Sequence, residues 1–139
     1  MSTRHREKQE KVFRTITQLA EDSAQGALIV VEGQKDLDAL KCLGVSGKVL
    51  LAKTGGKSFN LLLQKIEKEQ PKRVILLLDF DRRGREITAK LKQGLERERI
   101  KLDLTFWHTF RALVGRDVQC IESLTSYMRT LDQKITKCG

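Results

Sequence analysis

Short aliphatic runs alternate with helix-like segments along most of this chain, and that alternation limits the folds open to it. Residues 27–31 and 74–78 are continuous apolar runs of the kind that forms strands buried on both faces. Further strands are predicted at residues 48–52 and 102–107. Strict alternation of strands and helices implies right-handed βαβ units, so the sequence predicts an α/β fold with a mostly parallel four-stranded sheet and helices on both faces.

Helical periodicity accounts for the remaining segments and suggests one domain. An amphipathic helix is expected over residues 5–24, with Val12, Phe13, Ile16, Leu19 and Ala20 on its apolar stripe. Further helices are expected at residues 36–43 and 58–69, around Ile87, Leu91 and Leu95, and around Ile121, Leu124, Met128 and Leu131. We expect an N-terminal helix (1–25) packed on a core (26–107), followed by a C-terminal helical extension (108–139).

The charge distribution points to a polyanionic partner. The 139 residues include 27 Lys or Arg against 18 Asp or Glu, a net charge of +9. Residues 82–116 alone hold ten basic and four acidic residues, a net of +6. Basic surfaces bind phosphate backbones by releasing counterions, although a solvated helix face would also explain such a run.

Other function classes find little support in the sequence. There is no apolar stretch of membrane-spanning length, and the N-terminus is charged rather than signal-like, so we expect a cytoplasmic protein with no membrane partner. The three cysteines are odd in number and lack C-x-x-C spacing, which argues against a disulfide framework or a zinc ribbon. Neither His5 nor His108 has metal-ligand spacing.

Carboxylates follow two of the predicted strands. Glu32 comes directly after the first strand, and Asp79 and Asp81 come after the third. Ligands of open parallel sheets bind at the carboxyl ends of the strands. Three carboxylates there would repel one another unless a cation neutralised them, and oxygen ligands favour Mg²⁺ or Mn²⁺. The alternative for either aspartate is a helix cap.

Two further segments have alternative interpretations. Thr54-Gly55-Gly56-Lys57-Ser58 is similar to a phosphate-binding P-loop but has Leu51 in place of the required first glycine, so we expect a tight turn there. Phe106-Trp107-His108 would end the fourth strand. Its aromatic residues are expected to pack in the core, with base stacking as the alternative.

Three segments together resemble the Toprim domain, which topoisomerases, bacterial-type primases and certain nucleases share. They are residues 30–36 (Val-Val-Glu-Gly-Gln-Lys-Asp), residues 54–56 and residues 76–84 (Leu-Leu-Leu-Asp-Phe-Asp-Arg-Arg-Gly). The resemblance covers about residues 26–107. It implies a flavodoxin-like strand order in which the first and third strands are neighbours. It also implies that Glu32 acts as a general acid or base and that Asp79 and Asp81 bind a divalent metal.

The sequence also indicates which branch of the Toprim family this chain resembles. Type IA topoisomerases carry a glutamate soon after the two aspartates, where this chain has Arg82 and Arg83, and they use a tyrosine nucleophile. The only tyrosine here, Tyr127, is expected to be a packing or interface residue of the last helix and not a nucleophile. Neither a complete topoisomerase nor a complete primase is therefore expected. The architecture is most similar to small Toprim proteins related to the endonuclease that matures 5S ribosomal RNA.

The sequence thus predicts a metal-dependent nuclease acting on structured RNA in preference to DNA. Catalytic and metal-binding roles fall to Glu32, Asp79 and Asp81 with Mg²⁺ or Mn²⁺, and supporting roles to Asp36, Gly33 and Gly84. Nucleic-acid contacts are expected from Arg82, Arg83, Arg85, Lys35 and Lys57. The alternative is a noncatalytic nucleic-acid-binding or assembly module that works with a larger protein partner.

Overall fold

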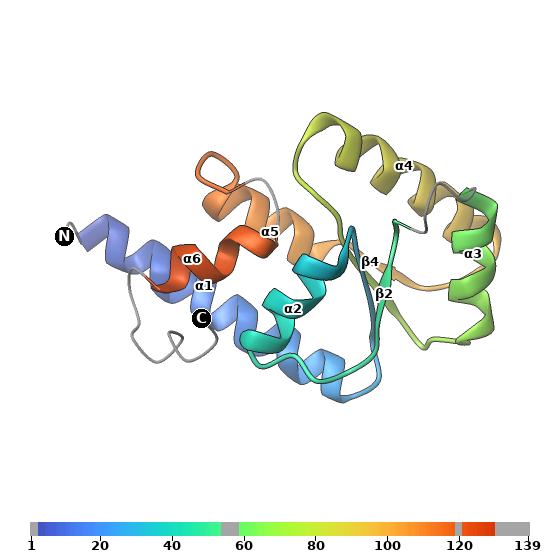
Figure 1. Cartoon of the computed structure of the whole chain (residues 1–139), viewed down its shortest axis with the longest axis horizontal. Helices are drawn as coiled ribbons and strands as arrows, with labels where there is room; N and C mark the ends of the chain where they lie inside the picture. The colour runs from blue at the N-terminus through green and yellow to red at the C-terminus, as the bar shows by residue number, and fades with distance from the viewer. Residues whose placement is uncertain (1–2, 54–58, 119–120, 130–139) are drawn as a thin grey trace.

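The computed structural model describes residues 3–53, 59–118 and 121–129, and these form a three-layer α/β structure (Figure 1). The helices are α1 (Thr3–Ala24), α2 (Gln34–Cys42), α3 (Phe59–Lys68), α4 (Arg82–Arg97), α5 (Thr105–Val114) and α6 (Glu122–Arg129). The strands are β1 (Leu28–Val31), β2 (Val49–Leu51), β3 (Val74–Leu77) and β4 (Leu102–Asp103).

The four strands form one parallel sheet in the order β2-β1-β3-β4. This confirms the predicted sheet and the adjacency of the first and third strands. The register aligns Val31, the last residue of β1, with Leu51 of β2 and Leu77 of β3. Because the strands are parallel and in register, the residues that follow β1 and β3 emerge at the same edge of the sheet.

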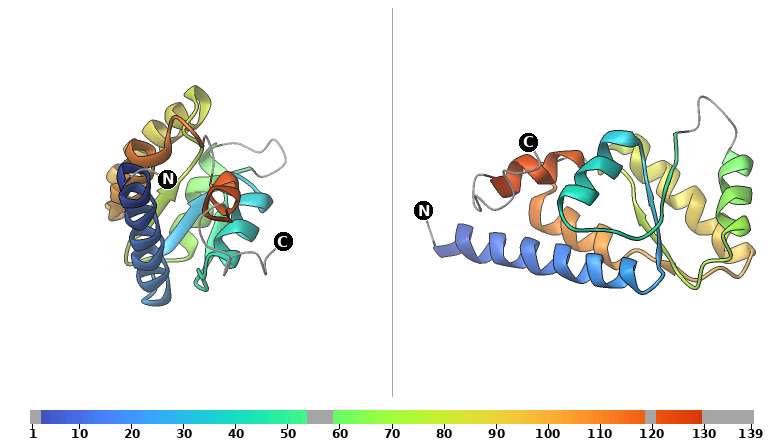
Figure 2. Two further views of the ribbon diagram at one scale, coloured as in Figure 1. Left: turned by 90° about the vertical axis from the view of Figure 1, so that its left-hand side faces the viewer. Right: turned by 60° about the horizontal axis from the view of Figure 1, so that its bottom comes forward.

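Side chains of β1 and β3 alternate between two apolar cores, as strand geometry requires. Ile29, Val31, Ile75 and Leu77 face a core completed by α1, α2, α5 and α6. Leu28, Val30, Val74 and Leu76 face a second core completed by α3 and α4. Figure 2 shows these helix groups on opposite sides of the sheet, with α1 and α5 side by side. Burial on both faces explains why both strands are uninterrupted aliphatic runs.

The predicted fourth strand was too long. Strand β4 ends at Asp103, and the residues beyond it form helix α5. Asp103 accepts a hydrogen bond from the backbone N–H of Thr105 (2.8 Å), which helps to start the helix. An apolar run of this length does not by itself distinguish a strand from a helix. Since Phe106 and Trp107 are 6% and 4% exposed, they are core residues and are unavailable for base stacking.

Helix α1 packs against α5 through a narrower stripe than predicted. Val12, Ile16 and Leu19 are buried, whereas Phe13 is 50% exposed. The prediction that Phe13 belongs to the buried stripe was therefore wrong. None of the described helices combines the length and apolarity needed to span a bilayer. Residues 54–58, with Lys57 and the P-loop-like turn, lie outside the described residues, as does Leu131.

Candidate active site

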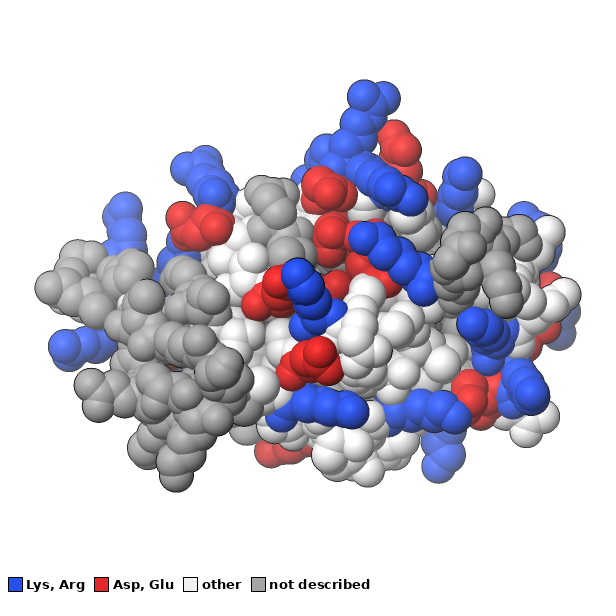
Figure 3. All heavy atoms as spheres, in the orientation of Figure 1, with Lys and Arg blue, Asp and Glu red and all other residues white. Residues whose placement is uncertain are grey.

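The predicted carboxylates gather at the carboxyl edge of β1 and β3. Glu32 directly follows β1, Asp36 lies in the first turn of α2, and Asp79 and Asp81 follow β3. The charges of Glu32, Asp36 and Asp81 all act on the Asp79 carboxyl. Figure 3 shows several acidic side chains near the middle of one face of the molecule, interspersed with and bordered by Lys and Arg side chains. The sheet thus assembles an acidic site on a basic protein.

Glu32 is a buried acid whose hydrogen bonding is incomplete. Glu32 is only 7% exposed, and its Oε1 has no hydrogen-bond partner among the described residues. Its backbone carbonyl accepts from the N–H of Lys53 (2.9 Å), which extends the pairing of β1 with β2 and fixes the backbone. Leaving a buried polar atom unsatisfied is costly, and such an atom is often a ligand or a catalytic group.

Asp79 carries the most perturbed carboxyl in the cluster. Burial, a side-chain hydrogen bond with Glu32 and the charges of the neighbouring acids raise its pKa from 3.8 to about 8. Two carboxylates in contact cannot both ionise without a compensating cation. Near neutral pH the Asp79 carboxyl is therefore largely protonated, and a metal ion could provide the same neutralisation.

Asp81 serves as the N-cap of α4. Its Oδ1 accepts a hydrogen bond from the backbone N–H of Gly84 (2.7 Å), and the side chain is exposed. The helix-cap alternative therefore holds for Asp81. The cap uses one carboxylate oxygen, so capping and metal binding do not exclude each other.

Gly84 allows the first turn of α4 to pack closely against the backbone of Asp79. A Cβ at this position would lie 2.1 Å from the backbone carbonyl oxygen of Asp79. Gly33 is different, because among the described residues a Cβ there would meet only Lys53 Cδ at 4.0 Å. A glycine is therefore needed at position 84, because the helix approaches Asp79 too closely for a side chain. No comparable contact with a described residue requires the glycine at position 33.

Trp107 holds the backbone that carries Asp79. Its indole Nε1–H donates a hydrogen bond to the carbonyl of Leu78 (2.8 Å), and its ring lies 5.9 Å from that of Phe80. The residues on both sides of Asp79 are thereby attached to α5. Sequence reasoning missed this contact because it assigned Trp107 to a strand.

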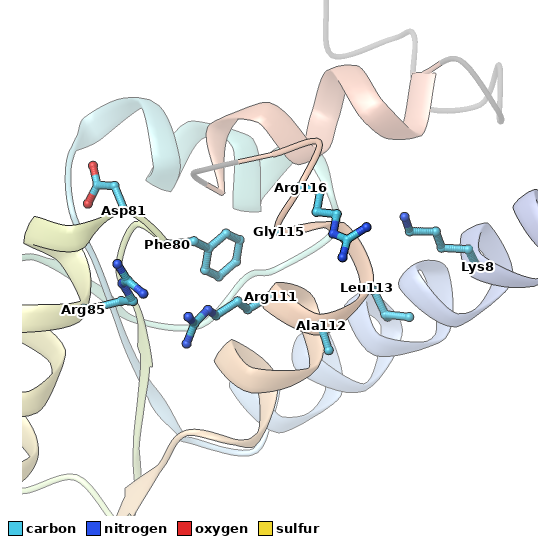
Figure 4. Close-up of a pocket in the computed structure, with 9 residues that line it drawn as sticks. All are labelled: Lys8, Phe80, Asp81, Arg85, Arg111, Ala112, Leu113, Gly115 and Arg116. Carbon is cyan, nitrogen blue, oxygen red and sulfur yellow. The ribbon is translucent and has the colours of Figure 1, made fainter.

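The basic residues predicted to contact nucleic acid do not all lie in one place. Arg82 and Arg83 in the first turn of α4 and Lys35 in the first turn of α2 are exposed, and Arg82 pairs with Glu86 (3.1 Å). Arg85 instead lines a pocket that also contains Lys8, Arg111 and Arg116, none of which was among the predicted nucleic-acid contacts, although both arginines lie in the basic run at residues 82–116 (Figure 4). They come from separate segments, and no local motif joins them.

The donor chemistry of the cluster suits a hard divalent cation. The Glu32, Asp79 and Asp81 side chains offer only carboxylate oxygens, which is the set that Mg²⁺ and Mn²⁺ prefer. Within the described residues, no three such groups are already arranged as a metal-binding cage. The residues that would hold an ion are Glu32, Asp79 and Asp81.

Comparison with known proteins identifies the family. The sequence profile of the Toprim domain matches residues 27–105, which contain β1, β3 and all four carboxylates. The chain belongs to the Toprim domain family. Toprim domains typically bind Mg²⁺, and membership supports metal-dependent processing of nucleic acids in general terms.

The Toprim relatives include proteins of similar length. A UPF0292 protein of Methanosarcina barkeri is 32% identical over 97% of this chain and 92% of its own length. A UPF0292 protein of Methanocaldococcus jannaschii is 33% identical over 86% of this chain and 91% of its own length. A solved structure of an Aquifex aeolicus protein superposes with a TM-score of 0.66, with 27% identity over 79% of this chain and 94% of the other. None of these names states an activity.

Proposed function

We propose that this Toprim protein is a Mg²⁺-dependent nuclease that cleaves phosphodiester bonds in structured RNA in the cytoplasm. The observation that supports this most strongly is the pair formed by Glu32 and Asp79. One acid is buried with an unpartnered oxygen, and the other has its pKa raised to about 8 by burial and by its acidic neighbours. A buried acid next to an acid with a strongly raised pKa, at the carboxyl edge of a parallel sheet, is typical of catalytic sites.

In this proposal the acids divide the chemistry. Asp79 and Asp81 hold the metal ion, and Glu32 moves a proton through its unpartnered Oε1 or completes the ligand set. A bound Mg²⁺ would neutralise the clustered charge and polarise the phosphate. Asp36 keeps a positioning role, because both of its carboxylate oxygens already accept backbone hydrogen bonds.

Exposed basic residues next to the acids would hold the RNA backbone. Arg82, Arg83 and Lys35 lie in the first turns of the two helices that begin at the site, and Arg85 is one turn further into α4. Lys57 is assigned to this group from the sequence alone. RNA is preferred over DNA as the substrate because the chain resembles small Toprim proteins related to the 5S ribosomal RNA maturation endonuclease.

A second candidate function is a noncatalytic module that binds nucleic acid for a larger protein partner. It is favoured by the finding that, in the described part of the chain, no three acids form a ready metal cage. A partner that closes on the site could then be needed to position both the acids and the substrate.

One cleavage assay distinguishes the nuclease from the noncatalytic module. Parent protein and Glu32→Gln are incubated with structured RNA, single-stranded DNA and supercoiled DNA, each with Mg²⁺, Mn²⁺ or a chelator. A nuclease predicts metal-dependent RNA cleavage by the parent that falls roughly 10²- to 10⁴-fold in Glu32→Gln, with little change in RNA affinity. Glu98→Gln, an exposed acid at the far end of α4, should cleave like the parent. Tight binding without cleavage would favour the noncatalytic module.

A further inference from the structure

A basic pocket opens beside the carboxylates and is formed largely by residues outside the Toprim motifs. It has a volume of about 400 Å³, within the range of small-ligand sites. Four basic side chains line it, and the carboxylate of Asp81 lies at its edge (Figure 4). Lys8 comes from α1, Arg85 from α4 and Arg111 from α5, and Arg116 follows α5. The fold therefore brings together cations that are far apart in the sequence.

Most of these cations have no counterion in the part of the chain that the structure describes. In residues 3–53, 59–118 and 121–129, no carboxylate lies within ion-pairing distance of the guanidinium groups of Arg85, Arg111 and Arg116. Lys8 is the exception, because it pairs with Asp117 (3.2 Å). Guanidinium groups that line one pocket and have no paired carboxylate repel one another, and a bound anion would relieve that repulsion. Their planar arrays of donors match the oxygens of a phosphate.

The pocket is built on the same framework as the acidic site. The guanidinium of Arg111 lies over the Trp107 ring, 5.3 Å from its centroid. Trp107 also donates the hydrogen bond to Leu78 that fixes the backbone before Asp79. Phe80, between the two motif aspartates, lines the pocket. An anion bound at Arg111 would thus lie next to Trp107, the residue that also fixes the backbone before Asp79.

We propose that this pocket binds a phosphate group of the nucleic-acid strand, next to the phosphodiester held at the acidic site. The proposal deepens the proposed function and rests on it for the identity of the ligand. The phosphate could be an internal diester or a terminal monoester, since both present the same oxygens to Arg85, Arg111 and Arg116. A terminal phosphate would make the protein select the ends of its substrates.

Binding measured in chelator tests the pocket separately from catalysis. Fluorescence anisotropy is used to compare ten-nucleotide RNAs that carry a 5′-phosphate, a 3′-phosphate or only hydroxyl ends. The variants are Arg111→Gln/Arg116→Gln and, in case loss of the Trp107 contact perturbs folding, Arg116→Gln alone. The matched control is Lys72→Gln/Lys101→Gln, which removes the same charge from exposed positions at the opposite edge of the sheet.

The pocket variants should bind RNA roughly tenfold or more weakly than the control, because charge-assisted hydrogen bonds are lost. If the ligand is a terminal phosphate, the loss is confined to one of the phosphorylated RNAs, and inorganic phosphate competes with that RNA in the parent. If it is a diester, the loss is equal for all three RNAs. Pocket variants that bind every RNA as the control does would overturn the proposal, even if Glu32 proves catalytic. Weakened binding together with a parent that cleaves nothing would retain the pocket and refute the nuclease.

Discussion

Asp36 accepts a hydrogen bond from the backbone N–H of Glu122 at 2.9 Å and so joins the start of α2 to the start of α6, 86 positions along the chain. Its other carboxylate oxygen accepts from the N–H of Gly33 at 3.1 Å. One buried side chain therefore caps two helices next to Glu32. Asp36, an acid in the Toprim motif, therefore supports the site by holding the backbone at the starts of α2 and α6.

Replacing Asp36 with asparagine should destabilise the protein. Asparagine has one acceptor oxygen, so one of the two backbone N–H groups would face its amide donor and lose its partner. The expected cost is about 1–3 kcal/mol of the free energy of unfolding, measured by chemical denaturation. Amide hydrogen exchange should also speed up at the start of α6. Unchanged stability and exchange would show that the second cap contributes nothing.

The two motif glycines should respond differently to alanine. A Cβ at position 84 would lie 2.1 Å from the Asp79 carbonyl oxygen and force the backbone to move, whereas one at position 33 meets only a flexible side chain at 4.0 Å. Gly84→Ala should lower the free energy of unfolding by about 1–3 kcal/mol, as overpacking does. Gly33→Ala is the matched control and should lower it less. Equal effects would contradict the close approach of α4 to Asp79.

The raised pKa of Asp79 predicts an unusual dependence of stability on pH. Because the pKa rises from 3.8 to about 8 on folding, the native protein binds a proton that the unfolded chain has released. Without metal, this group should therefore lower the thermal midpoint as pH rises from about 4 to about 8. Asp79→Asn should flatten that decline and raise the midpoint at pH 8. Asp38→Asn, an exposed acid on α2, should follow the parent.

Affinity for structured RNA should depend steeply on salt if the basic residues after β3 contact phosphates. The log–log slope is expected to be roughly 0.9 per neutralised phosphate on a duplex and roughly 0.7 on a single strand. Arg82→Ala/Arg83→Ala should flatten the slope by about one to two units, whereas Lys72→Ala/Lys101→Ala should leave it unchanged. If both double variants keep the parent's slope, these arginines do not contact RNA.

How far the sequence predicted the molecule depends on the range of the interactions. Strands β1 and β3 were recognisable because both of their faces are buried, which leaves uninterrupted aliphatic runs. The acids after them could be assigned to one edge, because parallel strands end together. The start of helix α5 was placed too late, since a short apolar run with aromatic residues fits a strand or a helix. Within this segment Trp107 donates to the carbonyl of Leu78, 29 positions away, a contact that no local pattern indicates.

The second cap of Asp36 had no sequence signal, and the basic run at residues 82–116 did not show which of its residues would share a pocket. Lys8, Arg111 and Arg116 occur in segments whose charges are typical of solvated helix faces. Only the packing of α1 against α5 and the start of α4 after β3 bring them toward Arg85. Glu122 likewise becomes a partner of Asp36 through its backbone, which carries no residue-type signal at all.

Metal binding by the native protein tests the role of the carboxylates most directly. The thermal midpoint of the parent is measured at pH 8 with chelator and with increasing Mg²⁺ or Mn²⁺, together with Asp79→Asn/Asp81→Asn and the Asp38→Asn control. An ion that binds only the native state must raise the midpoint. We expect a saturable rise in the parent and the control, and none in the double variant. An equal rise in all three proteins, or none in the parent, would contradict a metal site at Glu32, Asp79 and Asp81.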